Sequence, residues 1–290
     1  MRLVIVSGLS GSGKSVALAM LEDLEYYCVD NIPAGLLPGF IAYTVRTSEP
    51  AYRLTAVGVD ARNRPEDLAD VPRLVAELRR SGIDCEMLFL RADNDTLIKR
   101  FSETRRRHPL SRAGLGLQEA LEQEQRLLAP VANAADLTVD TSRLSVHELR
   151  ELIRERVVER KSSHPSLLFQ SFAYRHGVPD DADFVFDARA LPNPYWEPSL
   201  RDCTGRDEAV AAFMSRHEEA SRFLEDVTGF LERWLPSLVR SNRSYLTVAV
   251  GCTGGQHRSV YLAERLAAHF NGRYGRALIR HRDLASRRHE

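Results

Sequence analysis

One short stretch carries residues whose types and spacing suit phosphate chemistry, namely Gly8-Leu9-Ser10-Gly11-Ser12-Gly13-Lys14-Ser15. It matches G-x-x-x-x-G-K-[ST], in which glycines let the backbone wrap around phosphate oxygens and helix-start N–H groups face the anion. Lys14 is predicted to reach the β- and γ-phosphates, and the Ser15 hydroxyl to contact Mg²⁺. The alternative interpretation is a glycine-rich strand-to-helix turn that binds nothing.

Two aspartates at the ends of predicted strands are candidates for the metal site. The apolar run 53–60 ends in Asp60, and the run 26–30 ends in Asp30. A carboxylate at the carboxyl end of a parallel strand can hold a metal's water, as a Walker-B acid does. Asp60 is the first choice and Asp30 the second, and a helix N-cap is the alternative for Asp60. The residues predicted to act in nucleoside triphosphate hydrolysis are Lys14, Ser15 and Asp60, with Ser15 and Asp60 at Mg²⁺.

A second loop between an apolar strand and a helix also suits an anion, and it reads Cys252-Thr253-Gly254-Gly255-Gln256-His257-Arg258-Ser259. Backbone N–H groups, a helix start and a forked guanidinium together favour anion binding. The C-x5-R-S spacing is similar to the phosphate loop of cysteine-dependent phosphatases. Phosphatase catalysis is disfavoured, because Gly251 stands where those enzymes usually carry histidine and no nearby aspartate is an evident general acid.

The C-terminal stretch 273–290 is basic in a chain whose 40 basic and 40 acidic residues cancel. It carries two acids and six arginines: Arg273, Arg276, Arg280, Arg282, Arg287 and Arg288. A localised basic segment indicates a phosphate-backbone partner, and arginine favours RNA because its planar fork pairs phosphates and stacks on bases. His281 adds a hydrogen-bond donor. A solvated terminal tail is the alternative.

The elements that must position these groups alternate strand and helix over the first 160 residues. This rhythm predicts an α/β fold, a doubly wound parallel sheet of the P-loop NTPase or kinase type, over residues 1–160. The polar, proline-containing stretch 161–166 is the expected linker. Residues 167–290 are expected to form a second, smaller α/β domain with the basic tail. Arg105–Arg107, at a predicted helix end, are either a phosphate-clamping lid or a solvated face.

The amino-acid composition limits which classes of protein this chain can belong to. Of 290 residues, 43% are hydrophobic and 28% charged, which is typical of a globular chain. No apolar run approaches the ~20 residues that a membrane span needs. The four cysteines lie far apart, which argues against a zinc site or a disulfide framework and for a reducing cytoplasm. A strand directly after the first methionine leaves no room for a signal peptide. We therefore expect a cytoplasmic protein.

Five stretches together resemble one family, the RapZ/YvcJ nucleotide-binding proteins. They are residues 8–15, YYCVDNIP at 26–33, residues 60–63, DARALPNPYW at 187–196 and VGCTGGQHRS at 250–259. The resemblance implies an ATP site at Gly8–Ser15 and a GTP contact at Asp60, Ala61, Arg62 and Asn63, with weak ATPase and GTPase activity. It also implies a homo-oligomer.

For the second domain, the resemblance implies binding of an amino-sugar phosphate and of a small regulatory RNA. Such an adapter presents the RNA to an endoribonuclease and so tunes amino-sugar synthesis. Thr253, Gly254, His257 and Arg258 match the family's sugar-phosphate pocket, and Tyr195 stands where some members carry histidine. The stretches Arg280–Arg282 and Arg287–Arg288 match its RNA-binding end. The runner-up is a small-molecule P-loop kinase, which has no need of a second anion loop or a basic tail.

Overall fold

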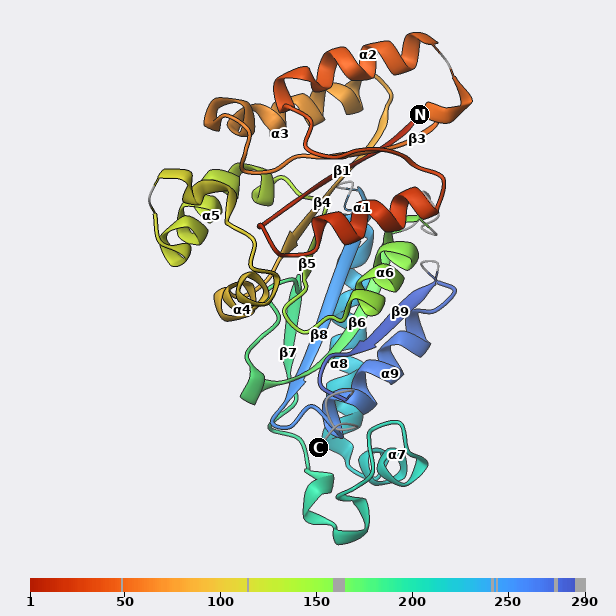
Figure 1. Cartoon of the computed structure of the whole chain (residues 1–290). Coiled ribbons are helices and arrows are strands. Elements are labelled where there is room, and N and C mark those ends of the chain that lie inside the picture. The colour runs from red at the N-terminus through yellow and green to blue at the C-terminus, as the bar shows by residue number, and fades with distance from the viewer. Residues whose placement is uncertain are drawn as a thin grey trace. The chain divides into compact units, whose positions relative to one another are not determined.

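The computed structural model describes residues 1–284 except 48, 114, 159–164, 241, 242, 244, 274 and 275. The chain divides into two compact units, Met1–Glu159 and Arg160–Glu290, each with its own parallel sheet (Figure 1). The α/β class and the two sheets confirm the fold predicted from the strand and helix rhythm. None of the helices described has both the length and the apolar character needed to cross a membrane.

The sheet of the first unit has the strand order β2-β3-β1-β4-β5, and every pairing is parallel. Its strands are β1 (Arg2–Gly8), β2 (Tyr27–Val29), β3 (Leu54–Gly58), β4 (Asp84–Arg91) and β5 (Leu137–Asp140). The central strands read as apolar runs because helices bury them on both faces. The carboxyl ends of all five strands meet at one edge, where the loop that follows β1 begins.

Helices cover both faces of this sheet, which makes it doubly wound. The helices are α1 (Lys14–Asp23), α2 (Leu37–Thr47), α3 (Pro65–Arg80), α4 (Asn94–Thr104), α5 (Leu117–Asn133) and α6 (Val146–Ile153). α1 and α6 pack together on one face, and α3 and α5 on the other. Leu3 and Ile5 of β1 belong to the core that α3 and α5 cover. α2 was not predicted from the sequence.

The second unit has a four-stranded sheet of order β7-β8-β6-β9, also parallel throughout. Its strands are β6 (Ser166–Ala173), β7 (Phe184–Asp187), β8 (Tyr245–Cys252) and β9 (Ala277–His281), and its helices are α7 (Glu208–Ser215), α8 (Glu218–Arg240) and α9 (Arg258–Phe270). One apolar cluster joins Phe169 and Val248 of the sheet to Leu231 of α8 and Leu262 of α9.

The C-terminal stretch differs from the basic tail that the sequence suggested. Ala277–His281 forms β9 and pairs with β6, so this part of the stretch belongs to the sheet. The strand was missed because its alternating pattern is short. Leu278 is buried while its neighbours are partly exposed, and the arginines around it made the stretch look like a polar tail. The proline-rich stretch after β7 contains two short 3-10 turns, Pro194–Trp196 and Pro198–Leu200.

Candidate functional site

The phosphate-type loop lies between β1 and α1, as the motif requires. Two of its glycines have no room for a side chain. A Cβ at Gly8 would lie 2.3 Å from the Leu90 carbonyl oxygen of β4, and one at Gly13, whose φ is +106°, would lie 2.7 Å from a methyl group of Leu149. The loop can therefore follow this path only with glycine at both positions.

The loop's carbonyl groups are held from outside by two side chains. The Arg100 guanidinium donates to the Gly11 carbonyl at 3.0 Å, and the Thr141 hydroxyl donates to the Ser12 carbonyl at 2.8 Å. Arg100 also donates to the Thr141 hydroxyl oxygen at 3.0 Å. Burial lowers the pKa of Arg100, and nearby carboxylates oppose that shift.

The Gly11 and Ser12 carbonyls are hydrogen bonded to side chains, whereas several N–H groups of the loop remain available to a ligand. Within the part of the chain that the structure describes, the N–H groups of Gly11, Gly13, Lys14 and Ser15 have no hydrogen-bond acceptor. Successive free N–H groups ahead of a helix form an anion-binding nest, which the helix dipole reinforces. The backbone is thus arranged for an anion before any ligand arrives.

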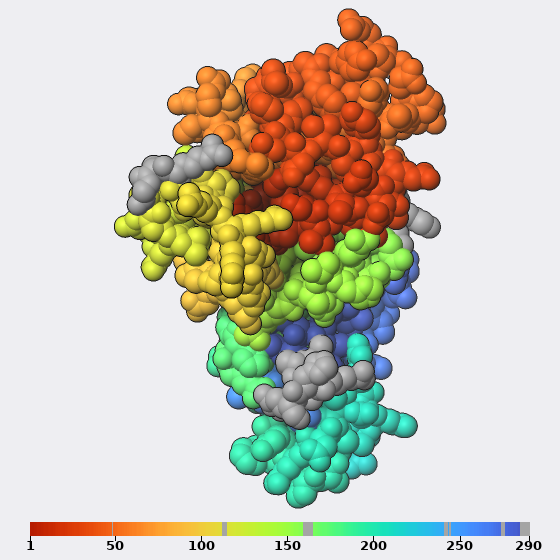
Figure 2. Space-filling model, in the orientation of Figure 1, coloured from red at the N-terminus to blue at the C-terminus, as the bar shows by residue number. Residues whose placement is uncertain are grey.

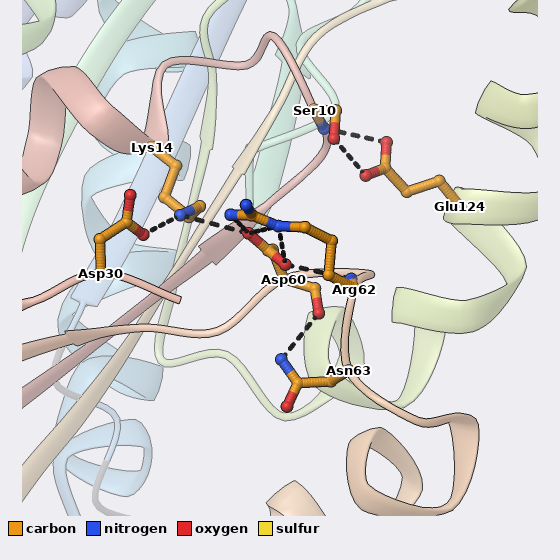
Figure 3. Close-up of polar contacts among 7 residues, drawn as sticks. All are labelled: Ser10, Lys14, Asp30, Asp60, Arg62, Asn63 and Glu124. Carbon is orange, nitrogen blue, oxygen red and sulfur yellow. Dashed lines mark hydrogen bonds and ion pairs between the residues drawn. The ribbon is translucent and has the colours of Figure 1, made fainter. Parts of the chain in front are cut away.

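Lys14 lies between the two candidate aspartates (Figure 3). Its ammonium group is paired with Asp30 and lies 3.5 Å from Asp60 Oδ2. The strand order explains the meeting, because β2, β3 and β1 are neighbours and both aspartates follow strand ends. Gly58 permits it, since a Cβ there would lie 2.5 Å from Asp30 Oδ1. The structure therefore brings both metal-site candidates to the loop's lysine.

The two aspartates differ in their surroundings. The Asp60 side chain is 8% exposed and accepts two hydrogen bonds from the Arg62 side chain, at 3.1 Å from Nε and 2.5 Å from Nη2. Burial favours the neutral acid, yet the Arg62 hydrogen bonds and the Lys14 charge leave the pKa of Asp60 lowered. The Asp30 side chain is 49% exposed. Asp60 is thus an anchored carboxylate, and Asp30 an accessible one.

The remaining residues of the 60–63 turn have distinct positions. The Asn63 side chain donates to the Asp60 carbonyl at 3.1 Å and accepts from the Ala34 N–H at 2.6 Å, so it fastens the turn. Ala61 is buried, while the Arg62 side chain is 48% exposed. Arg62 is therefore the residue of this turn that can reach a ligand.

The donor set fits Mg²⁺ in the form that nucleotide sites use. Mg²⁺ commonly takes one or two carboxylates together with phosphate oxygens and waters, and Asp60, Asp30 and the Ser15 hydroxyl are oxygen donors at this edge. No cluster of three or more histidine, cysteine, aspartate or glutamate side chains in the described ranges could hold a metal ion without such help.

Sequence reasoning missed three residues that hold the loop: Arg100, Thr141 and Glu124. Glu124 of α5 accepts hydrogen bonds from Ser10 and is fully buried (Figure 3). A signal for it was present, because Glu124 interrupts the apolar stripe Leu121, Leu128 and Val131 at helical spacing. Arg100 and Thr141 carried no such signal.

The second loop joins β8 to α9. The Cys252 sulfur is buried, accepts from the Gly255 N–H at 3.2 Å and lies 3.1 Å from the Ser259 hydroxyl oxygen. These contacts close the loop around the sulfur, and Gly255 adopts a φ of +66° to make them. Cys252 therefore acts as an internal acceptor that shapes the loop.

The Arg258 guanidinium is hydrogen bonded within the protein, whereas the sequence suggested that its two branches would be free to bind a phosphate. Its Nη1 donates to the carbonyls of Arg189 and Leu191 at 2.8 and 2.9 Å, and its Nη2 lies 3.3 Å from the Thr253 hydroxyl. The residue is 5% exposed, and its Nε is buried without a partner among the described residues. Arg258 thus fixes the turn after β7.

Gln256 and His257 also fasten the neighbouring chain. Gln256 Nε2 donates to the carbonyls of Arg201 and Cys203 at 3.1 and 2.7 Å, and His257 Nε2 donates to the Leu200 carbonyl at 2.9 Å. This holds the segment containing Tyr195, whose side chain is 49% exposed. Thr253 and Gly254 are the loop residues left at the surface.

The predicted RNA-binding residues fall into three groups. Arg282 and His281 are enclosed in the fold: Arg282 pairs with buried Asp283, and His281 is hydrogen bonded to Ser171 and Glu264. Burial holds the pKa of His281 below its usual value. Arg273 and Arg276 are exposed and Arg280 is half-buried. Arg287 and Arg288 lie outside the described residues.

Comparisons with known proteins agree with this two-unit organisation. A model of the RapZ-like N-terminal domain matches residues 1–161, and a model of the RapZ C-terminal domain matches residues 165–285. The chain is 55% identical over 286 residues to a nucleotide-binding protein of Thioalkalivibrio sulfidiphilus, covering 98% of this chain and 100% of that one.

Two further matches complete the comparison. A nucleotide-binding protein of Nitrosococcus oceani is 53% identical over 286 residues, with 98% of this chain and 100% of that one covered. Among solved structures, a shikimate kinase from Bacteroides thetaiotaomicron aligns with 53% of this chain and 98% of its own, at 16% identity and a TM-score of 0.35. The domain models and the full-length relatives show that the chain belongs to the RapZ family.

Proposed function

We propose that the first unit binds a nucleoside triphosphate, ATP or GTP, together with Mg²⁺. The carrying observation is the preformed nest, in which Gly11, Gly13, Lys14 and Ser15 offer free N–H groups while Arg100 and Thr141 hold the loop's carbonyls. Relatives whose sequences are 53–55% identical over 98% of this chain are named nucleotide-binding proteins. Free N–H groups, a lysine and two carboxylates match the needs of a metal–triphosphate.

In this proposal each residue has a stated task. Lys14 exchanges Asp30 for the β- and γ-phosphates, Ser15 and Asp60 hold the Mg²⁺ shell, and Arg62 at the surface of the 60–63 turn contacts GTP phosphates. Mg²⁺, when bound, neutralises charge that develops on the transferred phosphoryl group. Hydrolysis is expected to be slow, because Arg62 and Lys14 already engage the Asp60 carboxylate.

Binding of Mg·ATP and Mg·GTP to the full chain by calorimetry tests this proposal. Lys14→Ala should weaken affinity at least tenfold, because a charge-assisted contact to phosphate contributes more than about 1.4 kcal/mol. Lys99→Ala, at an exposed position of α4, is the control. Equal affinity of wild type and Lys14→Ala would contradict the proposal. Stoichiometric transfer of phosphate to a small acceptor would favour the runner-up, a small-molecule kinase.

For the second unit we propose an amino-sugar phosphate as the ligand of the Cys252–Ser259 loop. The support is the loop ahead of α9 and Arg258, whose buried Nε has no partner among the described residues and whose Nη2 lies 3.3 Å from the Thr253 hydroxyl oxygen. Arg258→Lys should abolish binding of glucosamine phosphate, because the single ammonium nitrogen of lysine cannot stand at the positions of both Nη1 and Nε. Nucleotide affinity should stay unchanged, and retained sugar-phosphate binding would count against the assignment.

We further propose that the chain is a cytoplasmic, homo-oligomeric adapter that presents a small regulatory RNA to an endoribonuclease and thereby tunes amino-sugar synthesis. Exposed Arg273 and Arg276 support the RNA contact within the described range. A structured RNA titrated against the full chain should bind with steep salt dependence. Arg276→Ala should flatten the logarithmic slope by about one. Binding equal to that of an unrelated protein would remove the adapter role.

A further inference from the structure

Glu124 is a charged residue at the core-facing side of α5, and both of its oxygens face the phosphate loop. The Ser10 N–H donates to Oε2 at 2.9 Å, and the Ser10 hydroxyl donates to Oε1 at 2.6 Å (Figure 3). The glutamate is 0% exposed. Burying a carboxylate is costly unless hydrogen bonds satisfy it, so its placement at this loop needs a reason.

His108 supplies a third hydrogen bond to the same carboxylate. The Leu110 N–H donates to His108 Nδ1 at 3.2 Å, so Nδ1 is the acceptor and the ring hydrogen lies on Nε2. That nitrogen lies 3.1 Å from Glu124 Oε2, and both side chains are fully enclosed. Three donors thus converge on two oxygens, an arrangement that the ionised carboxylate satisfies completely.

This contact chain joins the phosphate loop to an exposed arginine cluster. α4 ends at Thr104, its C-cap Arg105 adopts a left-handed φ of +51°, and Arg105–Arg107 are exposed. His108 follows directly and anchors the turn Pro109–Ala113 through Leu110. Figure 2 shows the yellow atoms of this part of the first unit lying against the red atoms of the first residues. The arginines therefore have a fixed base beside the loop.

We propose that Glu124 is a positioning residue of the phosphate loop and that His108 extends its hold to Arg105–Arg107. The proposal rests on the nucleotide binding proposed above. A nest binds phosphate well only when its backbone is ordered beforehand, because ordering during binding lowers affinity. Arg100 and Thr141 hold the carbonyls of Gly11 and Ser12, and Glu124 holds the N–H and hydroxyl of the preceding residue.

Because Glu124 is charged, the direction in which its removal changes nucleotide affinity distinguishes two roles for it. A carboxylate close to a phosphate site repels the ligand, so a residue without a positioning role would weaken binding by its presence. Its removal would then tighten binding. A positioning residue predicts the opposite, because its loss frees Ser10 and with it the start of the nest. Affinity measurements therefore separate the two roles.

The experiment compares Glu124→Gln with Glu122→Gln in the full chain. Glutamine has one acceptor oxygen, so its NH2 group would face either the Ser10 hydroxyl or both the Ser10 N–H and His108 Nε2. The Kd for Mg·ATP should rise about tenfold in Glu124→Gln, the effect of losing one charge-assisted contact. Glu122→Gln makes the same chemical change at an exposed position of the same helix and should leave the Kd unchanged. Circular dichroism checks that each variant is folded.

Ser10→Ala keeps the proposal testable if Glu124→Gln does not fold. It removes one donor at a half-buried position and should weaken Mg·ATP binding about tenfold, as the loss of one hydrogen bond to a charged group would. The double variant should bind no more weakly than Glu124→Gln alone, because both changes break the same contact. Additive losses would show that the two residues act separately.

Hydrogen exchange tests the second half of the proposal. In the wild type, Mg·ATP should slow amide exchange in residues 8–15 and also in residues 105–111. In His108→Gln, the side-chain NH2 can donate to Glu124 in place of Nε2, but no acceptor stands at the position of Nδ1 for the Leu110 N–H. Slowing should then persist in 8–15 and vanish in 105–111. Equal slowing of 105–111 in both proteins would overturn the link to the arginines.

The outcomes separate the inference from the proposed function. Absence of Mg·ATP binding in the wild type would overturn both. Wild-type binding that Lys14→Ala abolishes, with unchanged or tighter binding in Glu124→Gln, would uphold the nucleotide site and overturn the positioning role of Glu124. Weaker binding in Glu124→Gln together with an unaffected Glu122→Gln is the result that we expect.

Discussion

Arg62→Ala offers a quantitative test of how the Asp60 carboxylate is held. The change removes the Arg62 side-chain bonds to Asp60 and leaves the bond from the Arg62 N–H at 3.0 Å and the Lys14 ammonium at 3.5 Å. A hydrogen bond to a charged group contributes about 1.5–3 kcal/mol. The Arg62 side chain is 48% exposed, and solvent screening reduces that range to about 1 kcal/mol.

The loss should depend on pH in a defined direction. The pKa of Asp60 is lowered in the folded protein, with burial opposing the shift and Arg62 its main cause. A depressed folded pKa stabilises the protein above the unfolded pKa of about 4, and that contribution is lost as pH falls through the folded value. The difference in free energy of unfolding between wild type and Arg62→Ala should therefore be full at pH 7 and shrink below pH 4.

Urea unfolding of both proteins between pH 3 and 7 measures this difference. Arg80→Ala is the matched control, because Arg80 is exposed and has no side-chain partner in the part of the chain described. Its effect should be small at every pH. A difference between wild type and Arg62→Ala that stays constant from pH 7 to 3 would refute the reasoning, because the loss would then not act through the ionised Asp60.

Substitutions at three further positions test the loop geometries and the C-terminal packing. Gly8→Ala should destabilise by at least about 3 kcal/mol in thermal unfolding, because its Cβ would lie 2.3 Å from a backbone oxygen of Leu90; a stable variant would show that β4 can shift. Arg282→Ala should lower the free energy of unfolding by about 3 kcal/mol, because the buried Asp283 carboxylate loses its arginine. Near-wild-type stability would show that Arg282 does not stabilise this carboxylate. Cys252→Val should lose about 2 kcal/mol because the loop loses its acceptor, whereas Cys252→Ser should lose less, and equal losses would exclude that role for sulfur.

The two strand–loop–helix segments around the anion loops could be predicted from the sequence because their signals are local. An apolar run, closely spaced glycines, a lysine and a serine set the path of residues 8–15 over a few neighbouring positions. An apolar run, two adjacent glycines, an arginine and a serine do the same for residues 252–259. Glycine is required at position 8 by a strand far along the chain, but its presence could be seen in the motif alone.

Only the tertiary structure decided what the charged residues do. Asp30 and Asp60 compete for Lys14 because β2, β3 and β1 are neighbours, an order that no local pattern contains. Arg258 turned inward to hold the Arg189 and Leu191 carbonyls, although its motif suits a surface anion.

Glu124 and Arg282 show the physical reason. Each has partners about a hundred residues away along the chain, Ser10 for Glu124 and Ala173 for Arg282. A sequence gives the charge of a residue, but burial and the carbonyls or donors around it arise only when distant strands and helices come together. The path of the chain within one loop could therefore be predicted, whereas contacts shared between elements are decided by the fold.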